Sequence, residues 1–168
     1  TALIGFIEAR RDARVRDGML VPVPEQDTGL WNQDLIDRSA ALLTRASGIG
    51  KTGRFQLEAA IQAVHAARSV TGQTDWRGLP QLYTGLLHTY PPIGAAVSRA
   101  AVTAEDAGPA QGLALLDKIN FTEIDRFQPA LAVRAHCLVG VERWAEAAEA
   151  YDKAITLCTD TPSRRWLE

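Results

Sequence analysis

The sequence predicts an all-α fold, a right-handed α-solenoid in which about eight helices stack as antiparallel pairs. Hydrophobic residues recur with helical spacing along most of the chain. Strand-like alternation is confined to residues 19–24, where Pro22 and Pro24 favour an extended connector over a sheet strand. Helix pairs also recur about every 34 residues, which is the period of tetratricopeptide repeats.

The expected helices follow one another with short connections. They span Ala2–Asp17, Leu30–Ala46, Phe55–Val70, Asp75–Thr89, Pro92–Asp106, Pro109–Ile119, Phe127–Val139 and Trp144–Cys158. We expect Gly18 to end the first helix, because glycine is a common C-terminal stop. Asp27 or Thr28 is expected to cap the second helix, with Trp31 and several leucines on its inward side.

The repeat is clearest in the last helix pair, and its pattern can be traced backwards. The final unit has a small, an aromatic and a small residue at three diagnostic positions, Ala147, Tyr151 and Ala154. One period earlier these positions hold Leu113, Asp117 and Asn120, and two periods earlier they hold Leu79, Tyr83 and Leu86. The turn positions on the same step are Thr74, Gly108 and Glu142. We therefore predict a single helical-repeat domain over residues 1–168. Residues 1–54 hold an N-terminal helical pair with connectors, and residues 55–168 hold three degenerate units, at 60–93, 94–127 and 128–161.

Composition and charge narrow the functional classes. The 168 residues are 46% hydrophobic and 23% charged, as in ordinary globular proteins. No apolar run reaches the ~20 residues that span a bilayer. The net charge of −2 lacks the basic excess of a free-standing DNA binder, so no direct nucleic-acid binding is predicted. Cys137 and Cys158 are expected to be reduced, packed thiols on helices.

Three features resemble chemical motifs, but their contexts do not fit. Gly50-Lys51-Thr52 ends like a phosphate-binding loop, yet a helix precedes it and the first glycine is missing. A cationic inter-helix loop is the better interpretation. The three histidines fall on different helices without ligand spacing, and no nucleophile is paired with a base. The sequence therefore predicts no enzyme, no metal site and no cofactor.

Two candidate interaction sites remain. The connector before the second helix brings Glu25, Gln26, Asp27 and Trp31 together after a rigid proline-containing segment. It is either a connector that ends in an N-cap or a docking loop held by a rigid scaffold. By repeat position, a concave groove is expected to contain Arg68, Ser98, Arg99 and His136. The basic cluster at the end of the first helix is interpreted as a solvated helix end rather than a nucleic-acid patch; it comprises Arg10, Arg11, Arg14 and Arg16.

Several segments, taken in order, resemble one protein family. They are EARRDAR, PEQDTGLWNQDLI, GRFQLEAAIQAVHA, TDWRGLPQLY, SRAAVTAEDAGPAQGLALLD, RAHCLVGVERWAEAAEAYDKAI and SRRWLE. This series is similar to the C-terminal extension of the extracytoplasmic-function sigma factors associated with DGPF-motif proteins. The family usually reads E-D-Q-D-R where this chain has residues 24–28, and Asn-Arg where it has Ser98-Arg99.

The resemblance implies more than the residues alone. Sigma regions 2 and 4 are expected to precede such an extension and to be absent from this chain. The parent protein would direct RNA polymerase to specific promoters in the cytoplasm, and the extension would regulate it by contacting the sigma core, polymerase or a partner protein, with no membrane contact. The rival hypothesis is a free-standing tetratricopeptide adaptor for a peptide or helix, unrelated to transcription. An enzyme or small-molecule binder would need a buried polar constellation that the sequence does not reveal.

Overall fold

The computed structural model describes residues 1–168, except the side chains of Phe121 and Glu123. The all-α fold class is confirmed. The chain forms α-helices almost throughout, with three short 3-10 helices and a single two-stranded hairpin among the described residues. Contacts divide it into two compact units, Thr1–Tyr90 (unit 1) and Pro91–Glu168 (unit 2).

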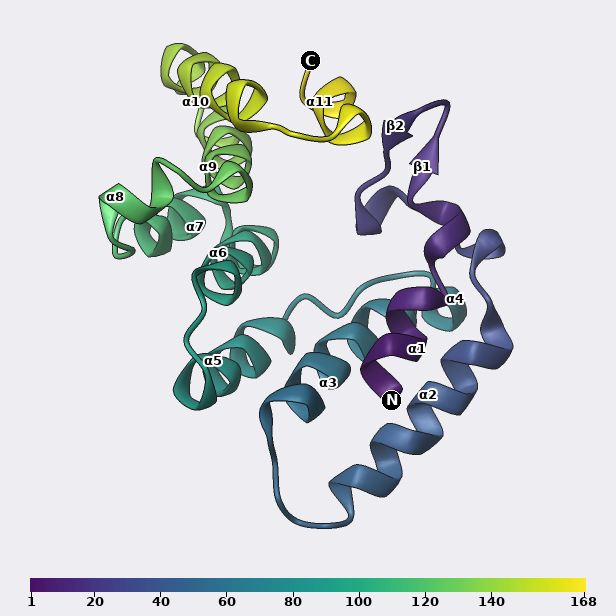
Figure 1. Cartoon of the computed structure of the whole chain (residues 1–168). Coiled ribbons are helices and arrows are strands. Elements are labelled where there is room, and N and C mark those ends of the chain that lie inside the picture. The colour runs from purple at the N-terminus through teal and green to yellow at the C-terminus, as the bar shows by residue number, and fades with distance from the viewer. The chain divides into compact units, whose positions relative to one another are not determined.

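Unit 1 is built from helices, and a short hairpin projects from them (Figure 1). Its α-helices are α1 (Ala2–Glu8), α2 (Gln33–Ser47), α3 (Arg54–Ala66), α4 (Arg68–Thr71) and α5 (Leu79–Thr89). The remaining elements are 3-10 helices η1 (Arg11–Ala13), η2 (Val23–Glu25) and η3 (Thr28–Leu30), and strands β1 (Val15–Arg16) and β2 (Met19–Leu20). Helix α1 packs against both α2 and α3, and their shared core contains Phe6, Trp31, Ile36 and Ala66.

The first helix is much shorter than predicted. Helix α1 ends at Glu8, and an antiparallel hairpin follows in which Val15 pairs with Leu20. Its turn is Asp17-Gly18, with φ values of 54° and 76°. An Asp-Gly pair is a strong signal for a two-residue hairpin, since both positions need positive φ. The prediction that residues 19–24 contain no sheet strand was therefore wrong.

The start of the second helix also differs from the prediction. Its N-cap is Asn32, whose side-chain oxygen accepts a hydrogen bond from the Leu35 amide at 2.9 Å. Asp27 instead caps η3, accepting from the Gly29 amide at 2.8 Å. Two capping residues in succession thus divide the predicted helix start into a 3-10 turn, an extended Trp31 and then α2.

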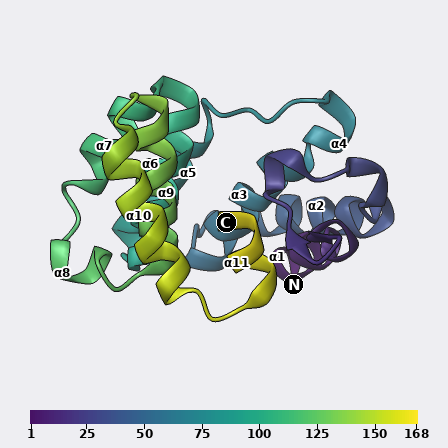
Figure 2. The same ribbon diagram turned by 90° about the horizontal axis from the view of Figure 1, so that it is seen from above.

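Unit 2 is a layered set of helix pairs, seen most clearly in Figure 2. Its helices are α6 (Ile93–Ala107), α7 (Pro109–Leu116), α8 (Phe121–Ile124), α9 (Gln128–Gly140), α10 (Trp144–Leu157) and α11 (Thr161–Leu167). The pairs α6/α7 and α9/α10 are in close contact, and α7 and α6 both contact α9. All eight predicted helices are present in order, whereas the short α8 and α11 were not predicted.

The repeat period is visible in the backbone and the core of unit 2. Gly108 (φ 104°) and Glu142 (φ 62°) both have positive φ and occupy equivalent turns, before α7 and α10. Leu113 and Ala147, also one period apart, are both buried. Thr74 does not continue the pattern, because a long connection that includes α4 separates α3 from α5. Most of the first predicted repeat, residues 60–90, falls within unit 1. The single right-handed solenoid over 1–168 stays a prediction.

No helix in the described part of the chain is long and apolar enough to cross a membrane.

Candidate interaction site

The connector between β2 and α2 forms an ordered loop, here called the 22–31 loop. Pro22 and Pro24 fix φ at two positions and lead into η2, after which Gln26 returns the chain to an extended conformation. Asp27 then caps η3, and Trp31 is extended again before Asn32 starts α2. The local sequence therefore builds a loop with two tight turns rather than a flexible connector.

The loop is fastened to the helices of unit 1 along its length. Arg68 on α4 donates from Nη2 to the Val23 carbonyl at 2.9 Å and to the Gln26 carbonyl at 2.6 Å. The buried Gln26 side chain donates to the Val21 carbonyl at 3.0 Å. At the end of the loop, the Asn32 amide donates to the Ala9 carbonyl at 2.9 Å. The loop backbone is thus held by the distant Arg68 side chain, by the local Gln26 side chain and by a backbone bond to Ala9.

Two arginines lie over the Trp31 ring. The Arg68 guanidinium carbon is 5.0 Å from the centre of the indole ring, and that of Arg10 is 5.8 Å away. Both distances are in the range of cation–π attraction, which strengthens when the groups are removed from water. Trp31 is only 6% exposed, so it belongs to the packed core beneath the loop.

Basic side chains dominate the electrostatics beneath the loop. Arg10 is 6% exposed and donates from Nη2 to the Gln62 side chain. Burial lowers the pKa of Arg10 to about 10, with Arg14 and Arg68 lowering it further and Tyr83 opposing them. Burial also lowers the pKa of His65 to about 4, again aided by the positive charges of Arg10 and Arg68. The His65 ring meets Trp76 edge-on, with centroids 5.9 Å apart.

The four residues predicted for the docking loop fall into two classes. Glu25 and Asp27 are exposed, whereas Gln26 is 5% exposed and Trp31 is buried. Gln26 and Trp31 are buried beneath the loop, so only Glu25 and Asp27 of the four are accessible in this conformation, and partner binding by the loop stays a prediction. Leu30, which was not predicted, is the last residue of η3 and is 53% exposed.

The predicted groove residues are distributed over both units. Arg68 belongs to unit 1, where its side chain is bonded to the 22–31 loop. Ser98 and Arg99 are half-buried on α6, and the exposed His136 on α9 lies 3.7 Å from Glu105, between Nε2 and Oε1. The structure therefore brings Arg68 together with Gln26 and Trp31, a grouping that repeat position did not predict.

Sequence reasoning also misjudged Arg10 and overlooked His65. The basic cluster was interpreted as a solvated helix end, which fits the exposed Arg11, Arg14 and Arg16 but not Arg10. The missed signal was the Asp17-Gly18 hairpin turn. The hairpin places residues 15–20 outside the first helix, and Trp31, which follows it along the chain, lies 5.8 Å from the Arg10 guanidinium carbon.

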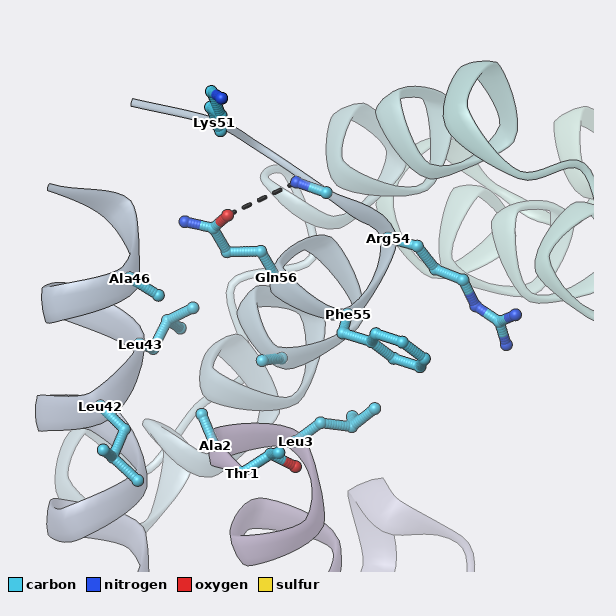
Figure 3. Close-up of a pocket in the computed structure, with 12 residues that line it drawn as sticks. Thr1, Ala2, Leu3, Leu42, Leu43, Ala46, Lys51, Arg54, Phe55 and Gln56 are labelled. Carbon is cyan, nitrogen blue, oxygen red and sulfur yellow. Dashed lines mark hydrogen bonds between the residues drawn. The ribbon is translucent and has the colours of Figure 1, made fainter. Parts of the chain in front are cut away.

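A separate apolar pocket of about 440 Å³ opens at the start of the chain. Figure 3 shows Leu42, Leu43 and Ala46 of α2 on one side of this space and Ala2 of α1 on the other, with Gln56 of α3 above them. Gln56 Oε1 accepts from the Gly53 amide at 3.4 Å, and Lys51 lies on the rim (Figure 3). The Gly50-Lys51-Thr52 segment is part of an inter-helix loop, as predicted.

The sequence also raised a chemical role for the cysteines and the potential metal ligands. Cys137 and Cys158 are both buried and unpaired, as predicted, and burial raises the pKa of the Cys137 thiol to about 11. Among the side chains that the structure describes, no three metal-binding groups gather closely enough to hold an ion.

Comparison with known proteins adds family information without a function. Residues 1–47 match a model described as a family of unknown function, DUF6596. Over 168 residues the chain is 29% identical to a protein of Rhizobium meliloti (strain 1021) that carries the name "Uncharacterized protein R00370". That match covers 99% of this chain and 40% of the relative, so the chain spans less than half of the relative's length. No solved structure matches. The family match contains α1, the hairpin, the 22–31 loop and α2.

Proposed function

We propose that this chain is a regulatory protein-interaction domain of a bacterial sigma factor. It would act in the cytoplasm by contacting the sigma core, RNA polymerase or a partner protein, and so influence which promoters polymerase uses. The proposal includes no catalytic step, no cofactor and no direct nucleic-acid contact by this chain. Its support is the resemblance that runs in order along nearly the whole sequence, together with the presentation of the 22–31 loop.

The loop geometry is the observation that carries the proposal. Glu25, Asp27 and Leu30 are exposed on a backbone that Arg68 and Gln26 hold in place. A fixed backbone lowers the entropy lost on binding, which favours recognition by a protein surface. Two carboxylates beside one apolar side chain suit a partner surface with a basic and an apolar part.

A free-standing tetratricopeptide adaptor remains the second candidate function. The paired helices of unit 2, with their repeated turns at Gly108 and Glu142, favour it because repeat arrays commonly bind peptides or helices. The Rhizobium protein is more than twice as long as the segment that matches this chain, which favours a domain of a longer polypeptide instead.

Transcription from the cognate promoter tests the proposal directly. The full-length parent protein is compared with a version that lacks this domain. A fall in transcription identifies a required positive element, and a rise identifies a built-in brake. An unchanged level contradicts a regulatory role and leaves the adaptor as the better hypothesis.

The role of the loop can be tested without disturbing its core. In the parent protein, Glu25→Gln, Asp27→Asn and Leu30→Ser change only exposed side chains, and asparagine can still cap η3. We expect the triple variant to alter promoter activity by at least about tenfold, the effect of losing ~1.4 kcal/mol of contact energy. Asp106→Asn, an exposed carboxylate on α6, is the matched control. Normal activity in the triple variant would remove the loop from the proposal.

A further inference from the structure

Beneath the 22–31 loop, five buried polar atoms have no hydrogen-bond partner among the described residues. They are Arg10 Nη1, Gln26 Oε1, Trp31 Nε1, His65 Nδ1 and Arg68 Nε. They come from segments far apart in sequence, yet both arginines lie over the Trp31 ring and both act on His65. Leaving one buried polar group unpaired lowers the stability of the fold by about 1–3 kcal/mol. Five such atoms in one place therefore suggest that a bound partner pairs with them.

The unpaired atoms are mostly donors. Guanidinium and indole nitrogens can only donate, which applies to the free atoms of Arg10, Arg68 and Trp31. Gln26 Oε1 is the one certain acceptor in the group, and a single amide oxygen cannot serve three donors. The set therefore lacks an acceptor with at least two oxygens.

The cluster also lacks negative charge. Arg10 and Arg68 form no ion pair with any described carboxylate. The nearest acidic residues in sequence are engaged or exposed: Glu8 pairs with Arg11 at 2.5 Å, Asp27 accepts from the Gly29 amide, and Asp12 and Glu25 are exposed. The buried Arg10 guanidinium lies near the half-buried Arg68 without a counter-charge, which costs free energy that a bound anion would offset.

We propose that Arg10 Nη1, Arg68 Nε and Trp31 Nε1 form a binding site for one carboxylate group. The other bonds of the two arginines, from Arg68 Nη2 to the loop and from Arg10 Nη2 to Gln62, stay in place when the site is filled. A carboxylate matches the donors because it is small, planar and carries two acceptor oxygens that bind guanidinium strongly. The donor atoms are covered, so a carboxylate would have to enter by displacing neighbouring side chains beside Arg68, the half-buried residue of the three.

Filling the site would stabilise the loop in its observed conformation, because Arg68 contacts the ligand and the loop backbone together. The carboxylate can come from a small free acid or from a Glu or Asp side chain of another polypeptide segment. Both sources present the same group to the same donors. The site lies within unit 1, and its existence does not depend on a role in transcription.

The indole N–H signal of Trp31 in NMR spectra of the full chain reports on the site directly. Sodium acetate represents a free carboxylate, and N-acetyl-glycyl-glutamyl-glycinamide represents a side chain. Acetamide, the glutamine version of the peptide and sodium chloride are the matched controls. We expect a saturable shift with at least one carboxylate and none with the controls; the tighter of the two identifies the source.

Variants assign the shift to the proposed donors. Arg68→Met and Arg10→Met should each weaken carboxylate binding by about tenfold or more, since each removes a charge-assisted hydrogen bond. Arg38→Met, an exposed arginine on α2, should bind like the unchanged chain. If either cluster variant fails to fold, the thermal stability of the unchanged chain still tests the site: the carboxylate that binds should raise the Tm with its concentration, and its neutral analogue should not.

Three results would overturn the proposal. One is the absence of a saturable Trp31 shift with both carboxylates. Another is an equal shift with acetamide, the glutamine peptide or sodium chloride. The third is unaltered binding in a folded Arg68→Met variant.

Discussion

Unit 1 contains a cluster of basic side chains that are wholly or partly buried, although the net charge of the chain is close to zero. Arg10 and His65 both lie where burial penalises the charged form, and Arg68 adds a second guanidinium to the same cluster. Trp31 offsets part of that penalty through its ring face. These contacts depend on residues that are brought together only by folding.

The neutral state of His65 makes the stability of unit 1 depend on pH. Its pKa falls from 6.5 to about 4 on folding, so between these values the unfolded chain binds more protons. The free energy of unfolding is therefore highest above pH 6.5 and falls as the pH drops towards about 4. The loss attributable to His65 is at most about 3 kcal/mol.

Urea unfolding followed at the Trp31 and Trp76 indole signals measures this effect. His65→Gln should remove the His65 part of the pH dependence between pH 7 and about pH 4.5. His88→Gln, which replaces an exposed histidine on α5, is the control and should retain it. Identical pH profiles for the unchanged chain and His65→Gln would show that His65 titrates normally in the folded state.

At the scale of elements, unit 2 depends on close helix approach at small residues. Gly112 on α7 lies against α6 and α9: an added Cβ would meet the Ala104 Cβ at 2.7 Å, the Ala100 carbonyl at 3.0 Å and the Cys137 sulfur at 3.1 Å. Because the contacts include backbone, the helices would have to move apart. Gly94 on α6, in contrast, has only the Phe127 ring, at 3.9 Å.

We expect Gly112→Ala to lower the free energy of unfolding by about 1–3 kcal/mol, through overpacking. Gly94→Ala is the matched control and should be neutral or stabilise by up to about 1 kcal/mol, because alanine favours a helix. Denaturant unfolding of the two variants measures both effects. Equal stability would mean that α6, α7 and α9 adjust without cost.

The turn at Glu142 offers a second test at this scale. Its φ of 62° is unfavourable for a residue with a side chain, whereas the equivalent Gly108 accommodates a positive φ. Glu142→Gly should therefore raise the free energy of unfolding by about 0.5–1 kcal/mol. Glu149→Gly, in the exposed interior of α10, should instead destabilise the chain by a similar amount. A loss of stability in Glu142→Gly would contradict the importance of the turn conformation.

At the scale of the whole molecule, each unit has its own hydrophobic core. The core of unit 2 is formed by α6, α7, α8, α9 and α10, with a second cluster that includes Leu167 of α11. We therefore expect residues 91–168 to fold alone, with a helical circular dichroism spectrum and cooperative thermal unfolding. The same chain with Leu116→Asp, at a fully buried position, is the unfolded control. A fragment indistinguishable from that control would show that unit 2 requires unit 1.

The sequence by itself determined the fold class, the order of the eight main helices and the equivalent turns at Gly108 and Glu142. These follow from local properties: hydrophobic periodicity, glycine and proline positions, and a repeat length set by helix geometry. The sequence also contained the hairpin signal at Asp17-Gly18, whose consequence for the first helix was missed.

Only the tertiary structure decided which predicted site residues point outward and which hold the loop from within. In sequence, Glu25, Gln26 and Asp27 are three adjacent polar residues that look equivalent. Arg68, more than forty residues away, bonds the Val23 and Gln26 carbonyls and holds the loop in the conformation in which Gln26 is buried. The Arg10, Trp31 and Arg68 cluster likewise joins the start of η1, the loop and α4. Periodicity describes one element at a time, whereas these contacts depend on how separate elements pack, and that is why the sequence alone did not reveal them.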